Sequence, residues 1–165
     1  MKNLLLISLL FGFLFINNCS KNEKIETVNI GNNQIEEQMI KAYQDGMSSF
    51  NNKSYLEAAK KFNEAEILFP QSEWAPKASL MAAYAYYIDD YNNRAISELL
   101  SFFKKYPINP NTSYAHYLLA MSYYNKIIDE KKDTEPLKNS KKQFEYIVKN
   151  YPNTEFSLDS KFKLD

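Results

Sequence analysis

An internal repeat is the feature of this 165-residue sequence that most constrains its fold. Three prolines, Pro70, Pro107 and Pro152, each follow an aromatic residue, and matching residues precede each proline by twelve, eight and five places. Offsets of four and three put the members of each set on one face of a helix. The first two of these prolines lie 37 residues apart. Self-similarity at a period of this length indicates stacked helical hairpins. The sets are Ala58, Phe62 and Ala65; Ala95, Leu99 and Phe102; and Ser140, Phe144 and Ile147.

Small residues recur upstream in the same register, since Gly46, Ala83 and Ala120 lie 37 positions apart. A small residue lets a partner helix come close, which explains a glycine that costs about 1 kcal/mol in a helix interior. The first unit, from Gly46 to Pro70, resembles the tetratricopeptide repeat at five consensus places. It departs from that repeat in its longer period and in lacking the consensus Trp of the first helix. The fold class expected is an all-α tetratricopeptide-repeat solenoid, with about three hairpins and the start of a fourth.

The expected helices follow from this register and from turn residues. Only three glycines and six prolines interrupt the chain, which favours helices throughout. The third unit carries a charged insertion around residues 130–136, because its prolines lie 45 apart instead of 37. The repeat domain is therefore expected over residues 34–165, with helices at 34–51, 55–69, 74–89, 92–106, 113–128 and 135–151 and a last helix from about 154.

The N-terminus reads as a targeting segment over residues 1–18, with Lys2 before an apolar run that is too short for a comfortable membrane span. Cys19 follows at once, in an arrangement that resembles a bacterial lipoprotein signal, in which this cysteine is lipidated. Asn18 is an unusual residue for the last place before the cysteine. An ordinary signal peptide or an uncleaved anchor is the alternative. Residues 19–33 are polar and aperiodic, and we expect them to form a flexible tether.

Composition and motifs argue against catalysis. The formal net charge is zero, which disfavours nucleic acid as a partner because phosphate binding needs concentrated positive charge. One cysteine and one histidine are too few for the usual zinc sites. His116 falls at a helix-packing position among aromatic residues, which favours a packed side chain over a catalytic base. We therefore expect a protein that is no enzyme and has no cofactor or metal.

Aromatic residues dominate the positions that would line the concave groove of a tetratricopeptide superhelix. Six of the twelve positions are Tyr, whose apolar ring and polar hydroxyl suit an extended peptide. The alternative is that these rings form core between neighbouring units. The twelve positions are Ile40, Tyr43, Met47, Phe50, Lys77, Leu80, Tyr84, Tyr87, Tyr114, Tyr117, Met121 and Tyr124, and the predicted peptide-binding residues are Tyr43, Phe50, Tyr84, Tyr87, Tyr117 and Tyr124.

Longer runs give a more specific resemblance. Residues 38–165 resemble the BamD family of lipoproteins of the outer-membrane β-barrel assembly machinery, in SEWAPKASLMAAYAYY from Ser72, NPNTSYAHYLLAMSYY from Asn109 and KNYPNTEFSLDSKFKLD from Lys149. The resemblance implies a non-enzymatic scaffold, lipid-anchored at the periplasmic face of the outer membrane. It implies as partners the barrel-forming subunit, other lipoproteins of the complex and unfolded outer-membrane proteins.

Two other functions stay open on the sequence alone. One is a cell-envelope adaptor of peptidoglycan or division machinery, and the other is a repeat module joined to a downstream enzyme domain. The apolar residues Phe156, Phe162 and Leu164 are unlike a finished terminal cap. We therefore expect the sequence to be the N-terminal part of a longer protein, a natural short form being the alternative.

Overall fold

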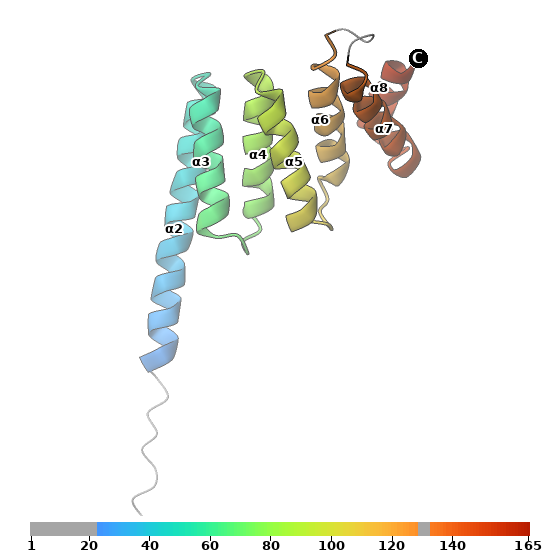
Figure 1. Cartoon of the computed structure of the whole chain (residues 1–165). Helices are drawn as coiled ribbons and strands as arrows, with labels where there is room; N and C mark the ends of the chain where they lie inside the picture. Colours follow the sequence, from blue (N-terminus) through green and yellow to red (C-terminus); the bar gives the residue numbers. More distant parts are fainter. Residues whose placement is uncertain (1–22, 129–132) are drawn as a thin grey trace, which may run out of the picture. The chain divides into compact units, whose positions relative to one another are not determined.

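The computed structural model describes residues 23–128 and 133–165, and these residues contain seven helices and no strand (Figure 1). Two compact units divide between Gln34 and Ile35, and the repeat domain is the second of them, Ile35–Asp165. The helices are α2 (Glu23–Asn51), α3 (Tyr55–Leu68), α4 (Ala75–Ile88), α5 (Asn92–Lys105), α6 (Thr112–Tyr124), α7 (Glu135–Asn150) and α8 (Glu155–Leu164).

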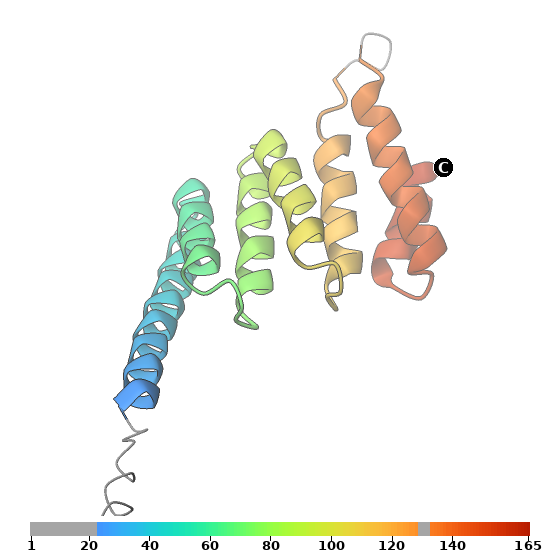
Figure 2. The ribbon, with the colours of Figure 1, turned by 60° about the horizontal axis from the view of Figure 1, so that its bottom comes forward.

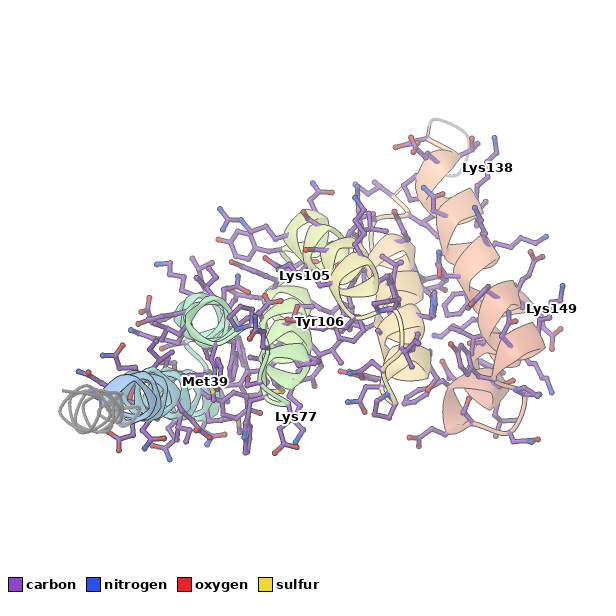
Figure 3. All side chains as sticks on the ribbon, turned by 90° about the horizontal axis from the view of Figure 1, so that it is seen from below. Met39, Lys77, Lys105, Tyr106, Lys138 and Lys149 are labelled. Atoms are coloured by element: carbon purple, nitrogen blue, oxygen red, sulfur yellow. The ribbon has the colours of Figure 1, made fainter. Side chains whose placement is uncertain are left out.

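Consecutive helices of the repeat domain run antiparallel and lie side by side (Figures 1 and 2). The first helices of the hairpins are α2, α4, α6 and α8, and the second helices are α3, α5 and α7. Viewed from below, the two sets form two layers (Figure 3). Among the first helices, the backbone of α4 comes close to that of α6, and α6 comes close to α8. The backbones of the second helices α3, α5 and α7 do not approach one another as closely within the described residues. The array therefore bends toward the first helices, which form its concave face.

The register inferred from the prolines is confirmed by burial. All nine residues of the three aligned sets are at most 2% exposed. The aligned small residues Gly46, Ala83 and Ala120 are buried as well. At Gly46 an added Cβ would lie only 2.8 Å from ring carbons of Phe62, so the glycine does permit a close helix approach. The tetratricopeptide-like solenoid expected from the sequence is the fold that is found.

The core is a series of local clusters along the array, as expected when each repeat packs only on its neighbours. One cluster joins α2, α3 and α4 around Met39 and Ala65, and the next joins α3, α4 and α5 around Phe62 and Tyr86. A third joins α4, α5 and α6 around Leu99, and the last joins α6, α7 and α8 around Phe144. The fourth hairpin contributes α8 to this last cluster.

A polar link connects the second helices of the first two units. Glu66 of α3 is only 3% exposed, and its Oε1 accepts hydrogen bonds from the Tyr106 hydroxyl at 2.8 Å and from Lys105 Nζ at 3.0 Å. Figure 3 shows Lys105 and Tyr106 on the side of α5 that faces α3. A buried carboxylate needs such partners, because an unpaired charge there would be strongly destabilising.

Two helix boundaries differ from the expected ones by more than one residue. Helix α2 begins at Glu23 instead of Gln34, so much of the expected tether is helical. The unfavourable step in helix formation is the first turn, and each residue added to an existing helix gains one hydrogen bond. Residues before Gln34 can therefore extend the packed helix without an apolar face of their own. Helix α6 ends at Tyr124 instead of 128, because the N–H groups of Lys126 and Ile127 turn back to the carbonyls of Tyr123 and Tyr124. The targeting segment, Cys19 and residues 129–132 of the insertion lie outside the described residues.

Candidate functional site

The concave face is hollowed at the first unit. The hollow has a volume of about 640 Å³ and lies along α2 and the residue before α4. Its lining is mainly apolar on one side and polar on the other, where Gln44, Ser48 and Asn51 follow one another along α2. The lining residues are Ile40, Tyr43, Gln44, Met47, Ser48, Asn51 and Trp74. Ile40, Tyr43 and Met47 are three of the four groove positions expected from the first unit.

Two aromatic side chains shape this hollow. Tyr43 packs edge-on against Phe62 of the core and against Trp74, with ring centroids 5.3 Å apart in both pairs. Burial raises the pKa of the Tyr43 hydroxyl. Lys77 Nζ lies 4.6 Å from the Trp74 ring centroid, at a distance that permits a cation–π interaction. Trp74 is thus held between a core-anchored tyrosine and a lysine.

The middle of the concave face is an aromatic stack that joins two units. Phe50 of α2 stacks on Tyr84 of α4 at 5.6 Å, and Tyr84 stacks on Tyr87 at 6.5 Å. All three rings are half-buried. Burial raises the pKa of the Tyr114 hydroxyl on α6 strongly, and the nearby Tyr84 and Tyr87 hydroxyls add to that effect. Tyr84, Tyr87 and Tyr114 also pack against the same core cluster, so the aromatic residues continue toward the third unit.

At the third unit, α8 takes up part of the predicted groove. The Tyr117 hydroxyl donates a hydrogen bond to Asp159 Oδ2 at 2.6 Å, and the Tyr117 ring lies 5.3 Å from that of Phe156. Burial and this bond raise the pKa of Tyr117. Tyr124 is 41% exposed, and Lys163 Nζ lies 5.1 Å from its ring centroid. Both tyrosines therefore contact the chain's own last helix.

The predicted groove residues thus form two groups. Tyr43 belongs to the open hollow and Phe50, Tyr84 and Tyr87 to the adjoining stack, whereas Tyr117 and Tyr124 pack with α8. None of the six side chains is fully buried, so they are neither entirely core residues nor entirely free groove residues. Their contact with another polypeptide stays a prediction. Trp74 was not among the predicted residues. It lies three residues before Lys77, the first groove position of the second unit, so the repeat register on which the prediction depended did not include it.

The histidine that the sequence analysis singled out lies on α6. His116 is half-buried, and its ring stacks on Phe103 at 4.2 Å while Nδ1 lies 2.8 Å from Gln143 Oε1, so it is packed as expected. Burial lowers its pKa. Within the part of the chain that the structure describes, no group of His, Cys, Asp and Glu side chains is placed to hold a metal ion. None of the described helices has the length and apolarity needed to cross a membrane.

Stacked hairpins with a half-exposed aromatic inner face define a helical-repeat protein of the kind that binds other polypeptides. The model of the family YfiO, described as outer membrane lipoprotein, matches residues 35–165. The chain belongs to this family, which confirms the resemblance seen in its sequence.

Curated relatives carry the name outer membrane protein assembly factor BamD. The chain is 33% identical to the one from Rickettsia prowazekii over 133 residues, which are 81% of this chain and 53% of the relative. It is 33% identical to the one from Caulobacter vibrioides over 123 residues, 74% of this chain and 40% of the relative. Identity to the one from Neisseria gonorrhoeae is 30% over 130 residues, with 73% and 49% coverage. The chain thus spans about half the length of these relatives.

Proposed function

We propose that this chain is the repeat module of a non-enzymatic outer-membrane protein assembly factor. Its concave face holds extended, apolar-rich segments of unfolded outer-membrane proteins before their insertion. Acyl chains on Cys19 anchor the module at the periplasmic face of the outer membrane. The barrel-forming subunit and other lipoproteins of the assembly complex are its stable partners. The names of the relatives and the family description support this proposal.

The observation that carries the proposal is the apolar hollow beside α2. Ile40 is 38% exposed, and Tyr43, Met47 and Trp74 line the same space. A polar row, Gln44, Ser48 and Asn51, borders it and can hydrogen-bond a peptide backbone. An extended strand presents alternate side chains to one side, so apolar residues can enter the hollow while the backbone meets the polar row.

Trp74 is the only tryptophan of the chain and lines the hollow, so its fluorescence reports occupancy. The test is a titration with a tryptophan-free synthetic peptide of alternating apolar and polar residues, taken from a barrel strand. We expect a saturable change in Trp74 emission. The variant Ile40→Lys should weaken binding about tenfold or more, because it places a charge in an apolar space.

The matched control is Leu100→Lys, since Leu100 is 44% exposed on the second helix α5. It should bind like the parent chain. Equal binding by the folded Ile40→Lys variant would contradict the assignment of the hollow. The adaptor of peptidoglycan or division machinery remains the alternative function, and co-purification with wall components instead of a large barrel protein would favour it.

A further inference from the structure

A second hollow lies on the face opposite the groove. Its volume is about 460 Å³, and it is lined by His116 of α6 and by residues of α7. His116 contacts Phe103 of α5 on one side and Tyr146 of α7 on the other. The hollow therefore lies over His116 beside α7, the second helix of its hairpin, on the convex face. We call it the convex furrow; its lining residues are His116, Lys142, Gln143, Glu145, Tyr146 and Lys149.

Two rings, His116 and Tyr146, line the convex furrow, and Phe103 supports His116 from the far side. The Phe103 and His116 rings stack with centroids 4.2 Å apart and planes 23° apart, and the His116 and Tyr146 centroids are 4.4 Å apart. Gln143 Oε1 lies 2.8 Å from His116 Nδ1 and fixes the orientation of the imidazole. Tyr146 remains 42% exposed. The Tyr146 ring is held in place on its His116 side and open to solvent elsewhere, so it can accept another aromatic side chain.

Positive charge flanks these rings. Lys142 and Lys149 are exposed and lie seven residues apart on α7, which separates them by about 10 Å along the helix. Among the described residues, neither takes part in an ion pair. The one carboxylate of the lining, Glu145, lies 4.0 Å from Lys141. In Figure 3 the side chains of Lys138 and Lys149 project outward from α7, so the helix presents an excess of lysine to solvent.

Exposed lysines on a helix are commonly no more than a solvated surface. Here the lysines border an exposed aromatic surface. A partner segment that carries both an aromatic ring and carboxylates can contact the rings and the lysines together. We propose that the convex furrow is a second docking site, separate from the groove, for a polypeptide segment in which an aromatic side chain is flanked by acidic residues. The aromatic ring packs on the exposed Tyr146 ring and against the edge of His116, and the carboxylates face Lys142 and Lys149. A basic segment is disfavoured by like-charge repulsion.

His116 is the only histidine of the chain, so its ring protons give a single reporter resonance at this site. The experiment titrates the full chain with a synthetic pentapeptide that has a central Phe between two acidic residues on each side. We expect a saturable shift of the His116 resonances. The bound carboxylates should also move the pKa of His116 upward, because nearby negative charge favours the imidazolium.

Charge-reversal variants show whether the peptide binds at the convex furrow or is only attracted by the overall charge of the chain. Lys142→Glu together with Lys149→Glu should weaken the peptide about tenfold, through two lost attractions and two new repulsions. The control Lys41→Glu together with Lys161→Glu makes the same change in net charge at two exposed positions elsewhere and should leave binding unchanged. The pentapeptide with Ala in place of Phe should bind more weakly than the original.

Three results would overturn the proposal. One is an unmoved His116 resonance at millimolar peptide, and another is equal weakening by the control pair of variants. The third is a shift produced by phosphatidylglycerol vesicles but not by the peptide, which would make the surface a membrane contact. Trp74 fluorescence reports the groove independently, so the failure of one site is distinguishable from failure of the other.

Discussion

Replacing Gly46 by alanine is the sharpest test of how tightly the first hairpin packs. In an open helix the change stabilises by about 1 kcal/mol, because glycine is a poor helix former. Here the new Cβ would lie 2.8 Å from two ring carbons of Phe62 and 3.2 Å from a third. Phe62 is fully buried and packs edge-on against Tyr43, so the ring has little room to move.

Overpacking of this kind costs roughly 1–3 kcal/mol. Set against the helix gain, the expected net loss for Gly46→Ala is on the order of 1 kcal/mol. The melting temperature should then fall by about 2–8 °C, given the usual dependence of that shift on domain size. Thermal and urea unfolding followed by circular dichroism measure both quantities. Gly31→Ala is the control, since an added Cβ there meets nothing within 4 Å, and it should be neutral or slightly stabilising.

A double-mutant cycle identifies the cause. Phe62→Leu destabilises on its own because it leaves a cavity. In that background the Gly46→Ala change should lose its penalty, because the clashing ring edge is gone. If Gly46→Ala stabilised the parent chain by the full helix propensity, or cost the same amount in both backgrounds, close packing against Phe62 would be the wrong explanation for the glycine.

Three further predictions concern polar groups. Tyr117→Phe removes the hydrogen bond to Asp159 and should destabilise by about 1 kcal/mol, with faster amide exchange confined to α8. Burial raises the pKa of Glu98, so its folded state favours the neutral form, and stability is lost as pH rises through that raised pKa. Glu98→Gln should therefore be stabilising at about pH 7 and close to neutral near pH 4, as urea midpoints would show. Burial lowers the pKa of His116, so stability should fall as pH drops below about 6.5, and His116→Phe should remove that slope.

Repeat register was the part of the fold that the sequence determined best. Burial of equivalent residues such as Phe62, Leu99 and Phe144 follows from a helical period combined with a fixed distance to proline, and both are visible in one sequence. Helix ends were less well determined. Helix α2 begins at Glu23 because the packed part of the helix is extended toward the N-terminus. The added residues need no apolar face, so the sequence holds no periodic pattern that marks the start of the helix.

The candidate site was predictable only in part. Ile40, Tyr43 and Met47 line the hollow because their helical face is set by the repeat register. Whether Tyr117 is open or engaged depends on Asp159, which lies far along the chain and outside any local pattern. The same holds for the convex furrow, where His116 meets residues of two other helices. Contacts between units are set by stacking geometry, which a single-repeat pattern does not encode.

Site-specific photo-crosslinking tests the central proposal most directly. A photoreactive phenylalanine analogue is placed at Ile40 in the hollow and, as the control, at Leu100 on the opposite layer, in the full-length protein within cells. Proteins crosslinked during outer-membrane protein synthesis are identified by mass spectrometry. Binding in the groove predicts that unfolded barrel proteins crosslink to position 40 and not to position 100. Equal crosslinking at both positions, or none at position 40, would contradict it.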